Sequence, residues 1–236
     1  MAAVKTTDEI GKLKRAAEAT QAVFARALPY IRAGISEREL ADMMEAFALE
    51  IPGVTGLSFT PIIASGPNGA QPHAEVTDRL LESGDLVTVD FGVMFDGFAG
   101  DMTRTFMIGE PCEKQRDIYE SVKRSQAAGI EAARAGIACA ALDAVCRDLI
   151  EADGYGEYFV HTTGHGVGAE VHEDPRIGKN SEAFLEPGMV VTIEPGIYIE
   201  GFGGVRIEDT ILITDTGCEI LTPEIPKELT LIPQED

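Results

Sequence analysis

The chain has 236 residues, a length that one hydrophobic core can serve, and its 44% hydrophobic and 25% charged residues are typical of a folded globular domain. Forty acidic against nineteen basic residues give a formal net charge of -21, which repels phosphate backbones and anionic lipids and argues against nucleic acid and membrane partners. The chain shows no signal-peptide core and no run approaching the roughly 20 apolar residues that span a bilayer, so we expect a cytoplasmic protein.

Two helices are predicted at the start of the chain, each marked by a capping box. Thr6 with Glu9 precedes a helical pattern of apolar residues that begins at Ile10. Ser36 with Glu39 precedes a second such pattern. We therefore expect two successive helices before the first strand.

A β-hairpin is predicted next, from the run LVTVDFGVMF to the run FAGDMTRTFMI. A loop at Phe95 and Asp96 would pair Asp90 directly with Asp101, whereas a turn at Asp96 and Gly97 would place these two acids diagonally. Either register puts both carboxylates on one face of the hairpin.

The later part of the chain repeats the earlier part. The letters ARAGIA at 133–138 echo IRAGIS at 31–36, an offset of 102. The letters EPGMVVTIEPG at 186–196 match ESGDLVTVDFG at 82–92, an offset of 104. Two matches at nearly the same offset indicate an internal duplication.

The duplication predicts two copies of one helix–helix–sheet unit, covering about 6–110 and 112–215. The copies are expected to pack about a pseudo-twofold axis, which places Asp90 of the first opposite Glu194 of the second. We expect a single catalytic domain over residues 1–236, with no N-terminal accessory domain.

The cysteines form no C-x-x-C pair, which is typical of small buried side chains in a reducing compartment. We expect this of all four: Cys112, Cys139, Cys146 and Cys218.

Four acidic side chains are predicted to face inward. Asp90 and Asp101 share a hairpin face, Glu194 ends a strand, and Arg206 and Glu208 lie two apart on another strand and so share a face. Burying an unpaired carboxylate costs several kcal/mol, so four together require neutralisation. A solvated strand face is the alternative for any one of them.

All four histidines lie in two Gly- and Pro-bounded segments, PNGAQPHA and HTTGHGVGAEVHE: His73, His161, His165 and His172. Two divalent cations would balance four carboxylates, with a histidine as an added nitrogen donor. In such sites, with ions ~3.5–4 Å apart, a shared water becomes hydroxide and a carbonyl is polarised, which predicts amide hydrolysis. Oxygen-rich ligation with one imidazole favours Mn²⁺, with Co²⁺, Fe²⁺ or Zn²⁺ as alternatives.

The blocks SGPNGAQPHA, VDFG, GDMTRTF, HTTGHGVGAEVHE, EPGIYI and GGVRIEDT resemble the signature blocks of the pita-bread-fold metallopeptidases, in family order and over nearly the whole chain. The resemblance implies an α+β fold whose two halves surround a dinuclear metal site. It also implies five ligands, with Asp101 and Glu208 bridging both ions: Asp90, Asp101, His165, Glu194 and Glu208.

Within this family, His161 and Arg206 resemble the proline-directed branch of Xaa-Pro dipeptidases and aminopeptidases. The resemblance implies that a metal-bridging hydroxide hydrolyses the N-terminal Xaa-Pro bond of short peptides with proline in second position. Glu194 would combine ligation with proton shuttling, because the leaving proline nitrogen must be protonated. His172 is expected near the scissile carbonyl and His73 near the amide.

Alternatives stay open at this point. A methionine aminopeptidase shares the ligands and the short length, and only His161 and Arg206 argue against it. A non-catalytic peptide- or protein-binding module on the same fold is opposed by the complete ligand set. Arg206 as a mere ion-pair partner on a strand surface is another alternative. Homodimer formation and a preference for dipeptides over longer peptides also stay open.

Overall fold

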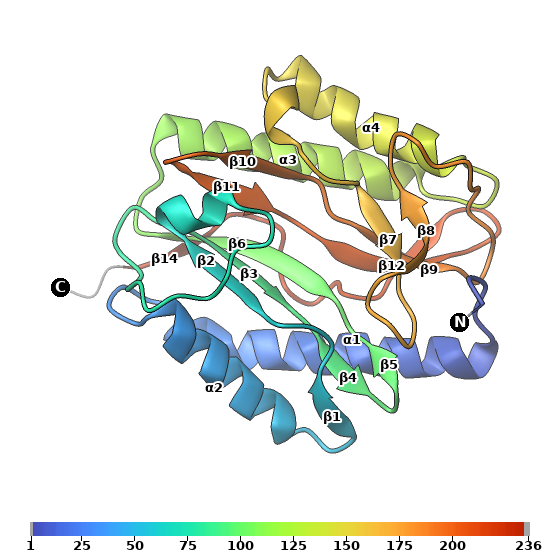
Figure 1. Cartoon of the computed structure of the whole chain (residues 1–236), viewed down its shortest axis with the longest axis horizontal. Helices are drawn as coiled ribbons and strands as arrows, with labels where there is room; N and C mark the ends of the chain where they lie inside the picture. Colours follow the sequence, from blue (N-terminus) through green and yellow to red (C-terminus); the bar gives the residue numbers. More distant parts are fainter. Residues whose placement is uncertain (1, 234–236) are drawn as a thin grey trace.

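The computed structural model describes residues 2–233 and consists of two halves with the same order of elements (Figure 1). Two helices open each half, and the strands follow them. In Figure 1 one helix pair lies along one side of the strands and the other pair along the opposite side. The pairs are α1 (Thr7–Ala27) with α2 (Glu37–Leu49), and α3 (Glu113–Ala132) with α4 (Cys139–Ala152).

The two predicted capping boxes are both formed. The Thr6 backbone N–H donates to the Glu9 carboxylate at 2.7 Å, and the Thr6 hydroxyl accepts from the Glu9 N–H at 3.3 Å. The Ser36 N–H donates to Glu39 at 2.9 Å, and the Ser36 hydroxyl accepts from the Glu39 N–H at 3.1 Å. These bonds satisfy backbone donors that a helix start otherwise leaves free, which is why α1 and α2 begin there.

The first-half strands form two sheets. One has the order β14-β6-β3-β2, in which β14 joins β6 in parallel and the other pairs are antiparallel. The other has the order β1-β4-β5. The strands are β1 (Val54–Leu57), β2 (Ile62–Ser65), β3 (Leu86–Phe91), β4 (Val93–Phe95), β5 (Phe98–Ala99), β6 (Met102–Ile108) and, from the end of the chain, β14 (Thr230–Ile232).

The second-half strands also form two sheets. One sheet has the order β13-β12-β9-β7-β8, and β10 and β11 pair separately. The strands are β7 (Gly164–Gly166), β8 (Glu173–Ile177), β9 (Val190–Ile193), β10 (Gly196–Ile199), β11 (Gly203–Arg206), β12 (Asp209–Ile213) and β13 (Cys218–Ile220). Short 3₁₀ helices lie at η1 (Leu28–Tyr30), η2 (Gly66–Ala70) and η3 (Gly156–Tyr158).

Backbone hydrogen bonds repeat between the halves. The Gly34 N–H donates to the Leu81 carbonyl at 2.9 Å, and the Gly136 N–H donates to the Leu185 carbonyl at 2.8 Å. The two glycines have φ of 89° and 80°, a conformation that glycine adopts at little cost, and each lies just before the second helix of its half. The sequence repeat therefore reflects a repeated local geometry.

The predicted hairpin turns at Asp96 and Gly97, whose φ values are 49° and 78°. Asp90 pairs with Thr103 in this register, so Asp101 lies diagonal to Asp90. The turn is therefore the second of the two arrangements that the sequence allowed.

Neither long hairpin is continuous. A side chain on Gly92 would collide with the Gly100 carbonyl, and the hairpin bends there from one sheet into the next. In the second half Glu208 falls between β11 and β12, so the expectation that it shares one strand with Arg206 is wrong. The reason is a bond to the other half, because the Glu208 N–H donates to the Thr103 carbonyl at 3.1 Å.

A buried arginine joins the halves. Arg104 on β6 is 1% exposed, and it donates to the Asp209 carboxylate at 2.8 Å and to the Glu208 carbonyl. It also donates to the carbonyls of Thr222 at 3.1 Å and Ile225 at 2.9 Å. A buried guanidinium is tolerated only when its donors are satisfied, so one side chain of the first half holds β12 and the C-terminal segment.

Each half has its own apolar core between its helices and its main sheet. Cys139 and Cys146 are buried in the second core, as expected, but Cys112 is exposed and Cys218 half-buried. The expectation of four buried cysteines is wrong for these two, since Cys112 caps the exposed start of α3 and Cys218 lies on the edge strand β13. Within residues 2–233, no helix is both long enough and apolar enough to cross a membrane.

Candidate metal centre

A cavity of about 810 Å³ is lined by residues of both halves and contains every side chain that the sequence predicted for the site. Apolar side chains, among them Phe59, Pro61, Val76 and Val171, form part of its wall. Polar groups gathered in a partly apolar cavity are typical of a ligand site. The predicted residues that it contains are His73, Asp90, Asp101, His161, His165, His172, Glu194, Arg206 and Glu208.

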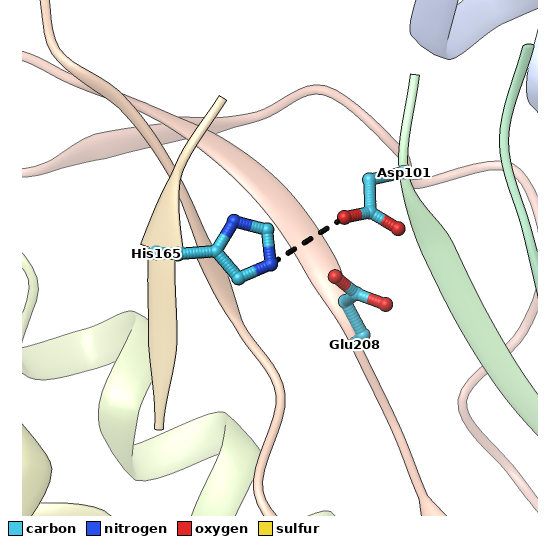
Figure 2. A group of neighbouring side chains, drawn as sticks. All are labelled: Asp101, His165 and Glu208. Atoms are coloured by element: carbon cyan, nitrogen blue, oxygen red, sulfur yellow. Dashed lines mark ion pairs between the residues drawn. The ribbon is translucent and has the colours of Figure 1, made fainter. Parts of the chain in front are cut away.

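Three buried side chains converge in this cavity, as Figure 2 shows: Asp101 just before β6, His165 on β7 and Glu208 just before β12. One potential ligand atom from each lies within 4.8 Å of the other two. His165 Nε2 is 3.6 Å from Asp101 Oδ2. These distances are short enough for the three side chains to share a metal ion.

Glu194 and Asp90 complete the acidic cluster. Glu194 Oε1 lies 3.1 Å from His165 Nε2 and accepts a hydrogen bond from the Thr192 hydroxyl at 2.9 Å. Asp90 Oδ2 accepts from the Arg206 guanidinium at 2.6 Å. The structure therefore brings all five predicted ligands to one place.

Two carboxylate oxygens in this cluster have no hydrogen-bond partner. Asp90 Oδ1 and Glu208 Oε1 are buried without one in the part of the chain that the structure describes. Such atoms are rare, and burying an unsatisfied acceptor costs about 1–3 kcal/mol, more when it is charged. Divalent cations would satisfy both oxygens, and four carboxylates with one imidazole form a donor set that suits Mn²⁺. The residues fit a divalent-metal site.

The electrostatics of the cluster favour cation binding. Burial first, and neighbouring carboxylates second, raise the pKa of Asp101 and of Glu208 well above the usual range. Burial also acts to raise the pKa of Glu194, but the hydrogen bond and charge of His165, together with the nearby His161 and Arg206, outweigh it and lower that pKa to about 2. Without cations Asp101 and Glu208 therefore hold their protons to higher pH than isolated carboxylates do, and metal binding would release any that remain.

Arg206 bonds to Asp90 directly and is linked to Glu208 through the Thr103 hydroxyl. The guanidinium donates to the Thr103 hydroxyl at 3.2 Å, to the Tyr198 hydroxyl at 2.7 Å and to Asp90 at 2.6 Å. The Thr103 hydroxyl in turn donates to Glu208 Oε2 at 2.6 Å. Arg206 is 3% exposed, so the alternative of an ion-pair partner on the strand surface is wrong.

His161 and Tyr198 form a hydrogen-bonded chain with Arg206. His161 Nδ1 lies 2.7 Å from the Thr162 carbonyl, which requires a proton on Nδ1 and leaves Nε2 to accept from the Tyr198 hydroxyl at 2.8 Å. Burial lowers the pKa of His161 and raises that of Tyr198 to about 12, so both are neutral near pH 7. Both ring nitrogens are thus bonded within the protein, and direct contact of His161 with substrate stays a prediction.

Tyr198 was missed in the sequence. The signal for it is alternation, because Tyr198 lies four residues after Glu194 in an extended segment and so faces the same side.

His73 and His172 lie on the open side of the cavity. Their side chains are exposed there, His73 in the loop after η2 and His172 just before β8. The His172 ring packs edge-on against His165 with centroids 4.3 Å apart. Burial, and then the neighbouring His165, lower the pKa of His172, which favours its neutral form. Both histidines are close to the acidic cluster without belonging to it.

Arg176 is a second cavity residue that the sequence analysis missed. It lies on β8 directly opposite His165, and its exposed side chain lines the cavity. Across the described range 2–233, its guanidinium has no hydrogen bond or ion pair. The sequence signal was an arginine four residues after a site histidine. Arg176 is a free cation at the open side of the site.

Known proteins resemble this chain closely. The chain is 45% identical over 229 residues to the uncharacterized peptidase YqhT of Bacillus subtilis (strain 168). The matched region covers 97% of this chain and 64% of that relative. It is 45% identical over 219 residues to a Xaa-Pro dipeptidase of Pyrococcus furiosus, covering 93% of this chain and 63% of the relative. The chain thus spans less than two thirds of these relatives' length.

The fold agrees with this similarity. The solved structure of a Xaa-Pro dipeptidase from Bacillus anthracis superimposes with a TM-score of 0.95 at 46% identity, over 98% of this chain and 64% of that one. The expected α+β pita-bread fold of two helix–helix–sheet halves is thereby confirmed. Residues 11–215 match the model of metallopeptidase family M24. The chain therefore belongs to metallopeptidase family M24.

Proposed function

We propose that this chain is a dinuclear-metal peptidase that hydrolyses the N-terminal Xaa-Pro bond of dipeptides or short peptides. The observation that carries the proposal is the acidic cluster with two unsatisfied carboxylate oxygens inside a substrate-sized cavity. Relatives named Xaa-Pro dipeptidase at 45% identity support the proline-directed reading over methionine aminopeptidase. A cytoplasmic location stays a prediction, and homodimer formation stays open.

The metal site would be held by the five predicted ligands. Mn²⁺ is the metal we propose, and Co²⁺, Fe²⁺ or Zn²⁺ are alternatives. When bound, a divalent pair polarises the scissile carbonyl and provides an activated water nucleophile. The full list of ligands is Asp90, Asp101, His165, Glu194 and Glu208.

The remaining steps belong to side chains of the protein. Glu194 would hold a proton and return it to the departing proline nitrogen, which must be protonated before the bond breaks completely. His172 would donate to the scissile carbonyl region, and His73 would lie near the amide. Arg206 would keep Asp90 oriented, since it already donates to that carboxylate at 2.6 Å.

The alternative of a non-catalytic binding module is less well supported. The unsatisfied oxygens Asp90 Oδ1 and Glu208 Oε1 argue against it, because a module with no metal has no need for buried acceptors without partners.

A matched peptide panel tests the proposal. We expect Met-Pro and Met-Pro-Ser to be hydrolysed at least tenfold faster than Met-Ala-Ser, which shares the first residue and differs at the second. The rate of methionine release, measured by chromatography, gives kcat/KM for each peptide. Equal rates on Met-Ala-Ser and Met-Pro-Ser would point to a methionine aminopeptidase, and no hydrolysis with metals bound would point to a binding module.

Arg176 leads to a prediction about peptide length. A free guanidinium beside the site can bind the C-terminal carboxylate of a dipeptide, and a hydrogen bond to a charged group contributes roughly 1.5–3 kcal/mol. Arg176→Gln should therefore raise KM for Met-Pro about tenfold or more, and should barely affect Met-Pro-amide, which lacks that carboxylate.

The control is Arg38→Gln. Arg38 also lines the cavity, but its guanidinium already donates to Asp78 at 2.6 Å and to the Val76 carbonyl at 3.2 Å. A KM for Met-Pro that rises equally in both variants, or rises equally for the amide, would contradict a carboxylate contact at Arg176.

A further inference from the structure

Arg147 and Asp143 form a buried ion pair on α4, and neither residue lines the cavity. Arg147 Nε lies 2.8 Å from Asp143 Oδ2, and a second guanidinium nitrogen lies 2.9 Å from Asp143 Oδ1. The residues are 7% and 1% exposed. Desolvation offsets most of the Coulombic gain of such a pair, so a buried ion pair is weak evidence for stability. Its other contacts are therefore more informative.

The other donors of Arg147 hold the segment that carries His161. They bond to the Phe159 carbonyl at 2.8 Å and to the His161 carbonyl at 2.8 Å, and neither carbonyl accepts another hydrogen bond from the described residues. The guanidinium also lies 4.0 Å from the centroid of the Phe159 ring, and the centroids of the Phe159 and His161 rings are 5.2 Å apart in a T-shaped arrangement. Arg147 thus contacts both the backbone and a ring neighbour of His161.

Asp143 holds the next part of the same segment. Its Oδ1 accepts from the Thr163 hydroxyl at 2.8 Å and, at 3.2 Å, from the Thr163 N–H, which also donates to the Ile177 carbonyl at 2.8 Å. The Thr163 carbonyl then accepts from the Glu194 N–H at 2.8 Å. Two consecutive contacts therefore join Asp143 to the backbone of Glu194.

We propose that Asp143 and Arg147 are positioning residues, which orient the His161 imidazole and the backbone at Glu194. The His161 tautomer depends on the Thr162 carbonyl, and residues 159–163 lie between η3 and β7 with few backbone bonds of their own. The ion pair on α4 adds hydrogen bonds to the Phe159 and His161 carbonyls, which accept none from the backbone of the described residues. The consequence for catalysis rests on the proposed function, whereas the orientation of His161 does not.

The test uses the small number of histidines. The full chain contains four, so a spectrum of the metal-free protein with ¹⁵N-labelled imidazoles shows four ring systems, and His161→Ala assigns one of them. We expect the wild-type His161 to be neutral with its proton on Nδ1. Asp143→Asn should replace this single tautomer by a mixture, or broaden the signal beyond detection, and leave the His73 signal in place.

Arg147→Lys is a second variant, chosen because the loss of the His161 tautomer in Asp143→Asn alone could also result from unfolding. Lysine keeps the charge beside Asp143 but cannot bond both carbonyls, so the same loss of the single His161 tautomer is expected in a folded chain. Asp85→Asn is the matched control. It breaks another ion pair with a buried carboxylate, in which the Arg79 guanidinium donates to Asp85 Oδ1 at 2.9 Å. Neither residue of this pair lines the cavity. It should leave His161 unchanged.

The outcomes separate the proposals. An unchanged His161 signal in folded Arg147→Lys, or an equal change in Asp85→Asn, overturns the positioning role. If Asp143→Asn and Arg147→Lys both unfold the chain, the His161 signal of Thr163→Val provides the test, since this variant removes only one hydroxyl bond to Asp143.

The activity of the same variants gives a second result. On Met-Pro, Arg147→Lys should lower kcat about tenfold with KM unchanged. A wild-type chain inactive on proline peptides would refute the proposed function and leave the spectral result valid.

Discussion

Replacing Glu208 by glutamine should lower kcat at least about 100-fold and leave the purified protein deficient in metal. Glu208 is 1% exposed, and its Oε1 has no partner in the described structure, while its Oε2 accepts from the Thr103 hydroxyl. Glutamine keeps the size and can keep the bond to Thr103. It removes the negative charge, and its amide nitrogen cannot ligate a cation as a carboxylate oxygen does.

The experiment measures metal content by mass spectrometry together with kcat on Met-Pro. The matched control is Glu228→Gln, which makes the same chemical change at a largely exposed residue whose partner is Lys123 at 2.7 Å. The control should retain both metal and activity, because exposed ion pairs contribute about 0–1 kcal/mol. Near-normal turnover of Glu208→Gln with two metals bound would remove Glu208 from the ligand set.

Chelation should abolish activity, and Mn²⁺ or Co²⁺ should restore it best. Four carboxylates lie close together in this cavity, and without cations burial and mutual repulsion raise the pKa of Asp90, Asp101 and Glu208. Binding of divalent ions replaces the retained protons, so re-addition should also acidify an unbuffered solution. Activity on Met-Pro after dialysis against a chelator, and after each metal is added, gives the result.

Two comparisons sharpen this experiment. Mg²⁺ should restore less activity than Mn²⁺, because the imidazole of His165 is a poorer ligand for Mg²⁺. Glu208→Gln should recover little activity at metal concentrations that restore the wild type. Full activity of a protein shown to be metal-free would exclude the proposed mechanism, and best recovery with Zn²⁺ would correct the metal while keeping the site.

Features encoded by neighbouring residues were predictable from the sequence. Thr6 with Glu9 and Ser36 with Glu39 mark the helix starts correctly, because a capping box involves residues three apart. The internal repeat identified the two halves, since both copies retain the same glycine before the second helix. The predicted site residues gather in one cavity because they lie in the turns and strand ends that face the boundary between the halves.

Contacts between distant segments were not predictable in this way. The break at Glu208 follows from a bond to Thr103, 105 residues earlier in the chain. Arg176 looks like an ordinary strand residue until its lack of partners is known, and Tyr198 looks like an ordinary strand aromatic. Their importance depends on which groups the tertiary structure leaves unpaired or brings within hydrogen-bond distance.

The proposed ligands are divided unequally between the halves. His165 lies on β7, which occupies beside β9 the place that β2 occupies beside β3, and β2 reads IIAS, with no histidine. A twofold-symmetric pair of identical ancestral halves would carry either two imidazoles at this position or none. A centre with a single nitrogen donor therefore requires two halves whose sequences differ at this position, as they do between β2 and β7. The single imidazole depends on this difference between the halves and not on the features that they share.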